Sequence, residues 1–204
     1  MVSQCGAAGS AMKRFQTAAQ FELSAKQLTL LQEEAAEIEA NPPNSEYTLK
    51  RCNKDDYKVW MATLTPTNIP AYAGGEFDVL IVATERYPIS APRIMFTTKI
   101  WHPNVAVDDG SVTLFDGKQG YRLQMTVCFL LNLLGKPQLK LRQNDEAAKQ
   151  YRDDRTAFEA KAKEWTAEHA KSMLGSNVKQ SQKDEPDQAD QSEVDPVDLE
   201  SEEE

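Results

Sequence analysis

Apolar residues recur at helical spacing soon after the start of the chain. The first stripe consists of four residues: Leu28, Leu31, Ala35 and Ile38. This spacing predicts an amphipathic helix. Ser24 and Gln27 lie three positions apart, as in a capping box, so we expect the helix to open at Ser24. The segment 41–44 (Asn-Pro-Pro-Asn) is expected to end it, because proline has no amide donor and restricts the residue before it.

Strand-like patterns follow this helix. Four short runs contain β-branched or aromatic residues: Tyr47 to Arg51, Val59 to Leu64, Phe77 to Ala83 and Ile94 to Phe96. Polar, glycine or proline residues separate consecutive runs. Such connections suit an antiparallel meander, since a parallel crossover needs about a dozen residues or more.

The segment from Trp101 to Tyr121 has no clear period and contains Pro103, Gly110 and two further glycines. A loop of about 20 residues inside a compact domain is uncommon and is usually functional. We therefore expect the functional site here.

Helical patterns return after this loop. They cover Thr126 to Leu134, a segment from Asp145 as cap through Tyr151, and a last helix from about Thr156. The last helix places four residues on one face: Phe158, Ala162, Trp165 and His169. A helix, a strand meander, a long loop and further helices define the α+β class.

The ends of the chain differ in composition from the middle. Residues 1–20 are rich in Ala, Gly, Ser and Gln and are expected to form a flexible leader. Residues 21–172 are expected to form one core domain. Residues 173–204 are polar and acidic, and we expect a disordered tail, because they cannot bury enough surface to offset the entropy of ordering.

The charge of the chain is concentrated in this tail. The 204 residues carry a net charge of −9, and residues 184–204 hold 11 acidic residues and no basic one. The remainder is nearly balanced, with 21 acidic against 23 basic residues. A near-neutral body with a polyanionic tail is a poor match for a phosphate backbone, so we expect no nucleic-acid partner.

Other classes are excluded by what the sequence lacks. No apolar run approaches the ~20 residues that span a bilayer, so we expect no membrane association. The three cysteines (Cys5, Cys52 and Cys128) are widely spaced, and with two distant histidines they offer no metal pattern. An intracellular protein, cytoplasmic or nuclear, without metal or cofactor is the expectation.

Three linked motifs resemble the ubiquitin-conjugating enzymes. They are Tyr-Ala-Gly-Gly-Glu-Phe at 72–77, Tyr-Pro-Ile-Ser-Ala-Pro at 87–92, and Phe-Thr-Thr-Lys-Ile-Trp-His-Pro-Asn at 96–104. The resemblance extends over roughly 150 residues, from the first helix to the last. It implies the UBC fold: an N-terminal helix, a four-stranded antiparallel sheet, the active-site loop and C-terminal helices.

The resemblance also implies acyl transfer, in which a cysteine carries ubiquitin as a thioester. The family's cysteine lies in Gly-x-Val/Ile-Cys-Leu, and this chain has Gly-Ser-Val-Thr-Leu at 110–114. Thr113 therefore holds the nucleophile position and is predicted to be inert, because a hydroxyl is a far weaker acid than a thiol. Asn104 falls at the position that stabilises the oxyanion and is expected to retain a loop-stabilising role. His102 is expected to organise the loop.

Two further positions depart from the family pattern. The family's acidic gate residue aligns with Leu141, which can neither orient nor deprotonate an amine. The loop that contacts ligases aligns with residues 121–124 and contains neither Trp nor Pro. Cys128 could be proposed as a displaced nucleophile, but we expect it to be a small buried hydrophobic residue.

Three hypotheses follow. The first is an inactive conjugating-enzyme-like protein that scaffolds ubiquitin, a ubiquitin-like protein, an active conjugating enzyme or a ligase, its tail attracted to a basic protein surface. The second is an active conjugating enzyme whose cysteine is altered here. The third is a structural UBC-fold domain outside the ubiquitin pathway.

Overall fold

The computed structural model describes residues 21–41, 45–114 and 120–170. The chain divides into two compact units, residues 1–173 and 174–204, and every described residue belongs to the first. The flexible leader and the disordered tail expected from the sequence lie outside the described residues.

The first described helix, α2, spans Ala25–Ala40. It begins where the sequence indicates: Ser24 is its N-cap, and a complete capping box joins Ser24 and Gln27. The Gln27 amide also donates to the carbonyls of Glu85 and Tyr87, at 2.8 and 2.9 Å. The capping residue therefore ties the helix start to the proline-bounded loop.

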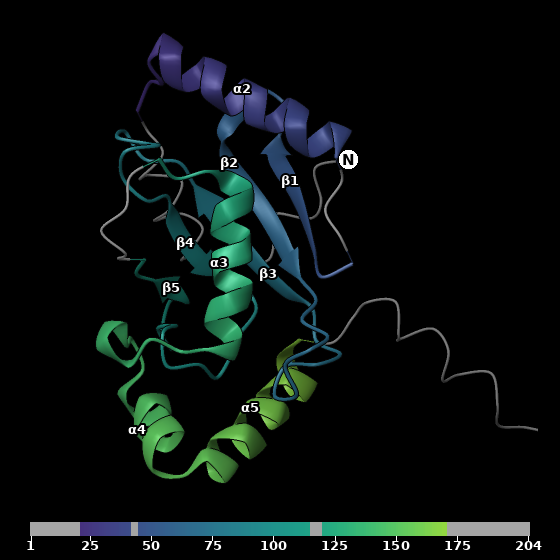
Figure 1. The fold of residues 1–204 in the computed structure, drawn as a ribbon, viewed down its shortest axis with the longest axis vertical. Helices are drawn as coiled ribbons and strands as arrows, with labels where there is room; N and C mark the ends of the chain where they lie inside the picture. Colours follow the sequence, from purple (N-terminus) through teal and green to yellow (C-terminus); the bar gives the residue numbers. More distant parts are fainter. Residues whose placement is uncertain (1–20, 42–44, 115–119, 171–204) are drawn as a thin grey trace, which may run out of the picture. The chain divides into compact units, whose positions relative to one another are not determined.

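The four predicted strands form an antiparallel meander (Figure 1). They are β1 (Tyr47–Asn53), β2 (Asp56–Leu64), β3 (Phe77–Val82) and β4 (Arg93–Phe96). The α+β UBC fold expected from the sequence is confirmed. A fifth strand that the sequence analysis missed, β5 (Ser111–Val112), pairs with β4, so the sheet has five strands in sequential order.

Three α-helices and a 3-10 turn follow the sheet. They are α3 (Leu123–Gly135), η1 (Leu139–Leu141), α4 (Asp145–Asp153) and α5 (Arg155–His169). Helix α3 begins three residues before the expected Thr126. The cap of α4 is Asn144 and not Asp145, because the Asn144 side chain accepts the Ala147 amide at 3.0 Å.

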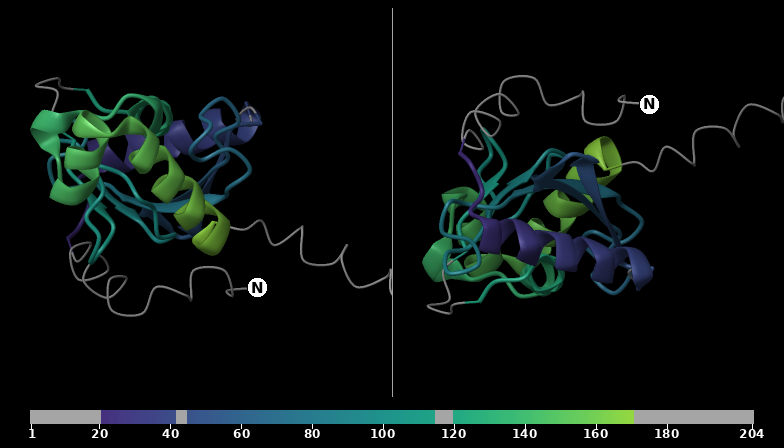
Figure 2. Two further views of the ribbon diagram at one scale, coloured as in Figure 1. Left: turned by 90° about the horizontal axis from the view of Figure 1, so that it is seen from below. Right: turned by 90° about the horizontal axis from the view of Figure 1, so that it is seen from above.

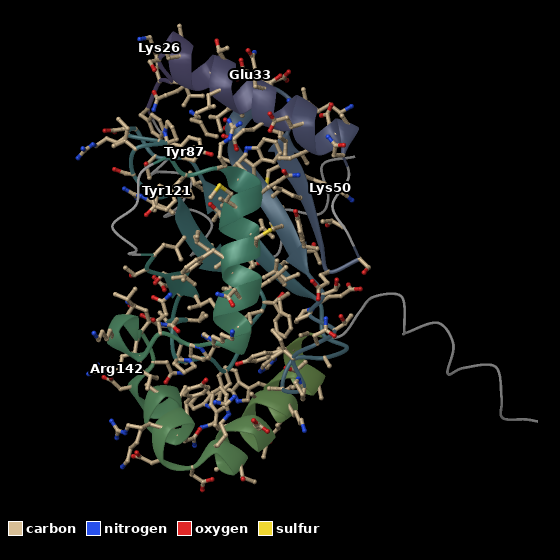
Figure 3. The ribbon with its side chains drawn as sticks, viewed as in Figure 1. Lys26, Glu33, Lys50, Tyr87, Tyr121 and Arg142 are labelled. Atoms are coloured by element: carbon tan, nitrogen blue, oxygen red, sulfur yellow. The ribbon has the colours of Figure 1, made fainter. Side chains whose placement is uncertain are left out.

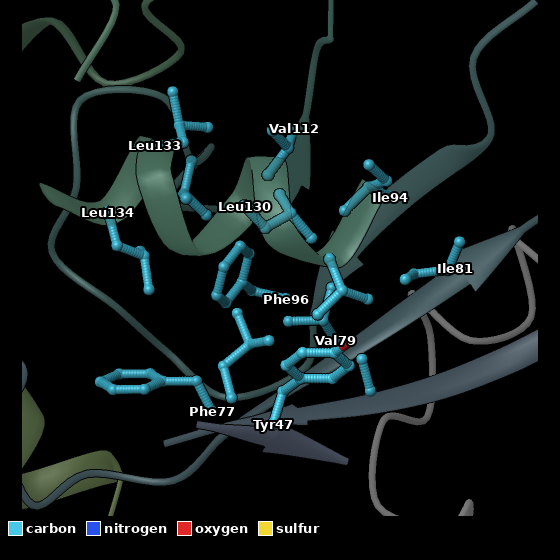
Figure 4. Close-up of a cluster of buried hydrophobic side chains, with 14 of the residues drawn as sticks. Tyr47, Phe77, Val79, Ile81, Ile94, Phe96, Val112, Leu130, Leu133 and Leu134 are labelled. Carbon is cyan, nitrogen blue, oxygen red and sulfur yellow. The ribbon is translucent and has the colours of Figure 1, made fainter. Parts of the chain in front are cut away.

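One face of the sheet packs against α3, and this contact forms the main core. Figure 4 shows Leu130, Leu133 and Leu134 of α3 facing side chains of the strands. Figure 2 views the same fold from its two ends, with α4 and α5 nearest the viewer on the left and α2 nearest on the right. Each fully buried leucine stabilises the fold by about 1.5–3 kcal/mol. We call this side the inner face.

A buried carboxylate joins three segments at one end of α3. Glu34 of α2 is 3% exposed; its Oε1 and Oε2 accept from the Tyr87 hydroxyl at 2.8 and 3.0 Å. Its Oε2 also accepts the Leu123 amide at 2.7 Å. Leu123 is the first residue of α3, whose N-cap Arg122 supplies no side-chain bond. Glu34 therefore caps α3 from a residue 89 positions away.

We expect Glu34→Ala to lower the free energy of unfolding by about 2–4 kcal/mol, because it leaves two buried donors without an acceptor. Glu33→Ala is the matched control: Glu33 lies on the exposed side of α2 (Figure 3), and we expect a change within about 0.5 kcal/mol. Urea denaturation measures both. Equal effects would contradict the capping role.

The ionisation of Glu34 predicts that the free energy of unfolding depends on pH. Burial raises the pKa of Glu34 above its usual 4.5, although its hydrogen bonds and Arg122 oppose this. The unfolded chain therefore ionises first, and stability from Glu34 is full below pH 4.5 and is lost as pH rises through the folded pKa. The unfolding free energy of wild type minus that of Glu34→Gln should fall as pH rises. If this difference in unfolding free energy instead rose with pH, the raised pKa of Glu34 would be contradicted.

Candidate functional site

The candidate site is built around the turn formed by His102, Pro103 and Asn104. The Pro103 carbonyl accepts the amides of Gln143 and Asn144, at 2.8 and 3.0 Å. These two residues connect η1 to α4. The turn therefore holds the segment before α4 against the loop that carries Thr113.

The Asn104 side chain is fully committed to backbone. Its Oδ1 accepts the Gln138 amide at 2.9 Å, and its Nδ2 donates to the carbonyls of Gln138 and Leu141 at 2.7 and 3.0 Å. The residue is 1% exposed. Both amide hydrogens are thus used within the fold, as a loop-stabilising role requires, and neither points to an open oxyanion position.

His102 is the first residue of this turn, and its side chain is completely buried. Its Nδ1 accepts the Asn104 amide at 3.0 Å, and its Nε2 lies 3.1 Å from the Leu133 carbonyl. An amide can only donate and a carbonyl can only accept, so the ring is the neutral tautomer with hydrogen on Nε2. Burial lowers the pKa of His102 from 6.5 to about 3. The neutral imidazole makes one hydrogen bond at each ring nitrogen and so joins the turn to the end of α3.

Thr113 follows β5 and is exposed. Its hydroxyl accepts a hydrogen bond from the Gln143 amide nitrogen at 3.1 Å. Gly110 shapes the approach to this strand: it has φ of +72°, and a Cβ there would collide with the Phe96 carbonyl. The contact at Gly110 therefore fixes the backbone before Thr113, and the Thr113 hydroxyl has the side-chain amide of Gln143 as its partner.

Leu141 ends η1 and is half-buried. Its carbonyl accepts from Asn104, so its backbone belongs to the site while its side chain supplies no polar group. Its neighbours Lys140 and Arg142 are exposed, and Arg142 pairs with Asp145 at 2.6 Å (Figure 3 labels Arg142). The structure thus brings His102, Asn104, Thr113 and Leu141 into one hydrogen-bonded neighbourhood.

Gln138 and Gln143 are site residues that sequence reasoning missed. Gln138 meets Asn104 across 34 positions, and Gln143 meets Thr113 across 30. Both lie within three residues of Leu141, the position aligned with the family's gate residue. Nothing in their spacing indicates these contacts, because the contacts depend on where α3 ends.

One expectation about α3 is wrong. Cys128 is exposed and not buried, because it lies on the side of α3 away from the positions that pack on the sheet. Of the residues aligned with the ligase-contacting loop, Tyr121 and Arg122 lie outside regular secondary structure. Leu123 and Gln124 belong to the first turn of α3, and Leu123 is completely buried.

The residues that the structure describes contain no group of three or more His, Cys, Asp or Glu side chains arranged to hold a metal ion. Within the same ranges, none of the helices has the length and apolar character needed to cross a membrane.

Comparison with known proteins agrees with this architecture. The family described as "Ubiquitin-conjugating enzyme" matches residues 30–166. The chain is 31% identical over 155 residues to "Ubiquitin-conjugating enzyme E2 27" of Arabidopsis thaliana, covering 73% of this chain and 80% of that protein. It is 28% identical over 144 residues to "Ubiquitin conjugating enzyme E2 B" of Dictyostelium discoideum, covering 69% and 96%.

A solved structure gives the same result. A protein from Plasmodium yoelii, assigned as a ubiquitin conjugating enzyme, has a TM-score of 0.63 and 30% identity, covering 74% of this chain and 99% of that one. The chain belongs to the ubiquitin-conjugating enzyme family.

We expect Asn104→Ala to lower the free energy of unfolding by about 2–4 kcal/mol, because one amide and two carbonyls lose their partner. Gln138→Ala is the control, since Gln138 joins this network through its backbone, and its effect should stay within about 0.5 kcal/mol. Chemical denaturation followed by tryptophan fluorescence measures both. If Asn104→Ala left the free energy of unfolding unchanged, the Asn104 hydrogen bonds would contribute nothing to stability.

Proposed function

We propose that the chain is a catalytically inactive member of this family that acts as a binding or scaffold subunit in ubiquitin or ubiquitin-like conjugation. The observation that carries the proposal is the Thr113 side chain. It stands where the family's motif has cysteine, and its hydroxyl is bonded to the Gln143 amide. A thioester needs a sulfur atom at this position.

The described groups that surround Thr113 supply no substitute chemistry. A carboxamide such as that of Gln143 is not basic enough to remove a hydroxyl proton. The imidazole of His102 is buried with both nitrogens bonded. The Asn104 amide is committed to the carbonyls of Gln138 and Leu141. Among the described residues, the site therefore has no thiol nucleophile, no general base and no free oxyanion donor.

The intact framework supports a binding role. Its partners would be ubiquitin or a ubiquitin-like protein, an active conjugating enzyme or a ligase, in the cytoplasm or nucleus. They would use surfaces away from Thr113, such as the outer side of the sheet or its loop ends. The tail, with 11 acidic residues between 184 and 204, would accelerate encounter with a basic protein surface.

A charging assay tests the absence of chemistry. With activating enzyme, ATP and ubiquitin, we expect wild type to form neither a reductant-sensitive nor a hydroxide-sensitive adduct, because Thr113 cannot form a thioester and has no base beside it among the described residues. Non-reducing electrophoresis with and without dithiothreitol, and then hydroxide, measures this. Thr113→Cys is the positive control, and we expect it to form a thioester, since the backbone around the site is held in place.

Two controls assign any adduct that does appear. A reductant-sensitive band lost in Cys128→Ser would make the exposed Cys128 a displaced nucleophile and would contradict the proposal. A hydroxide-sensitive band lost in Thr113→Ala would make Thr113 itself an acyl carrier. Titration of ¹⁵N-ubiquitin and of an active conjugating enzyme tests binding; absence of binding to both, in a chain that does not charge, would favour a structural domain outside the pathway.

A further inference from the structure

A surface hollow with a basic lining lies between η1 and α4. Its volume is about 280 Å³. The lining consists of six residues: Leu139, Arg142, Asp145, Ala148, Lys149 and Arg152. Three of these side chains are basic and one is acidic, so positive charge prevails. We call this site the basic hollow. Thr113 does not line it, so the basic hollow is distinct from the nucleophile position.

Two elements bring these charges together. Asp145, Lys149 and Arg152 follow one another at intervals of four and three residues along α4, so they lie on one face of that helix. The position of Arg152 in the last turn also suits the helix dipole. The dipole of α4 does not account for Arg142, because Arg142 ends η1 and lies outside α4. Cations therefore converge on the hollow from both of its walls.

The cations keep hydrogen-bonding capacity for a ligand. Arg142 donates from Nε to Asp145 at 2.6 Å, and no described residue bonds to its two terminal nitrogens. Within the same described ranges, Lys149 has no ion-pair partner. The side chains of Arg142 and Arg152 are 54% and 65% exposed. Exposed ion pairs contribute little to stability, so a partner's carboxylate can replace a neighbouring aspartate at little cost.

The surrounding segment strengthens the positive potential. From Lys136 to Arg152 the chain has five basic and two acidic residues, although its total charge is −9. Of the two acids, Asp145 is paired with Arg142, and Glu146 is paired with Lys161 of α5 at 2.8 Å and does not line the hollow. This segment is therefore a local basic region in an acidic protein.

We propose that the basic hollow binds an extended segment of a partner protein that is rich in aspartate and glutamate. Guanidinium groups bind carboxylates with two parallel hydrogen bonds, and an ammonium group adds a point charge. Leu139 and Ala148 supply apolar surface for the methylene groups of a glutamate side chain. A water molecule occupies about 30 Å³ of the liquid, so the hollow has room for an acidic side chain and the backbone that carries it.

An acidic polypeptide suits this site better than a nucleic acid. A phosphate backbone needs cations along its length, whereas three cations around one hollow suit a few carboxylates. The inference rests on the proposed binding role and adds the chemical class of the partner. It also adds a surface to the sheet face and loop ends considered above.

Fluorescence anisotropy with the full chain tests the proposal. The probe is a fluorescein-labelled peptide of four glutamates alternating with four alanines, and its counterpart has glutamine in place of glutamate. We expect the glutamate peptide to bind at least about tenfold more tightly, and its affinity to fall as salt shortens the Debye length. Arg142→Gln combined with Lys149→Gln should weaken its binding about tenfold, because two of the three cations of the lining are lost.

Matched variants separate a local site from the effect of total charge. Lys26→Gln combined with Lys163→Gln removes two exposed charges from α2 and α5, and we expect binding to stay within about twofold. Asp145→Asn removes the acid of the lining and should tighten binding about threefold, a gain that unfolding cannot produce. The Trp101 indole donates to Gln150 of α4 at 2.9 Å, so its emission checks that α4 stays packed in each variant.

Three results would overturn the proposal. Equal binding of the glutamate and glutamine peptides would show that carboxylates are not recognised. Equal weakening in the two double variants would show attraction by total charge alone. Tighter binding of an oligothymidylate with eight phosphates would assign the hollow to phosphate.

Failure of this inference is distinguishable from failure of the proposed function. A chain that binds ubiquitin without charging, but does not prefer the glutamate peptide, would contradict the basic hollow alone. A chain that binds the peptide as expected and also forms a thioester would contradict the catalytic inactivity alone.

Discussion

The hydrogen bonds of the Asn104 side chain are the interaction on which the functional end of this fold depends. They join the turn after β4 to the segment between α3 and α4, at Gln138 and Leu141. His102 fixes the same turn to the end of α3 through Leu133. Because a buried amide with three satisfied hydrogen bonds is costly to disturb, these bonds hold the loop in one shape.

This arrangement places the side chains that hold the loop apart from the side chain at the nucleophile position. The groups that hold the loop, His102 and Asn104, are buried and use their polar atoms internally. The side chain at the nucleophile position, Thr113, is exposed, and its hydroxyl accepts a hydrogen bond from the side-chain amide of Gln143. Replacing a cysteine by threonine at such a position removes a thiol without opening a cavity in the core. Stability and chemistry therefore lie in different side chains of one loop.

Much of the fold was predictable from the sequence, and the reasons are local. The capping box at Ser24, the alternation in the strands and the proline-bounded turns each depend on nearby residues. The two-residue strand β5 is too short for a periodic signal. For the site, the sequence motifs predicted which positions belong to it but not the contacts that these residues make. Contacts such as Glu34 with Leu123 and Gln143 with Thr113 join residues 89 and 30 positions apart, and no local pattern encodes them.

The exposure of Cys128 could not be predicted for a related reason: an apolar run does not show which side of the helix meets the sheet. The fixed shape of the loop depends on the Asn104 side chain being committed to the backbone. Hydrogen exchange by NMR tests this directly at the Gln138 amide and the Asn104 side-chain amide. We expect both to exchange as slowly as the amides of the inner strands. Exchange at the rate of exposed loop amides would mean that Asn104 is available for another role and would contradict the account.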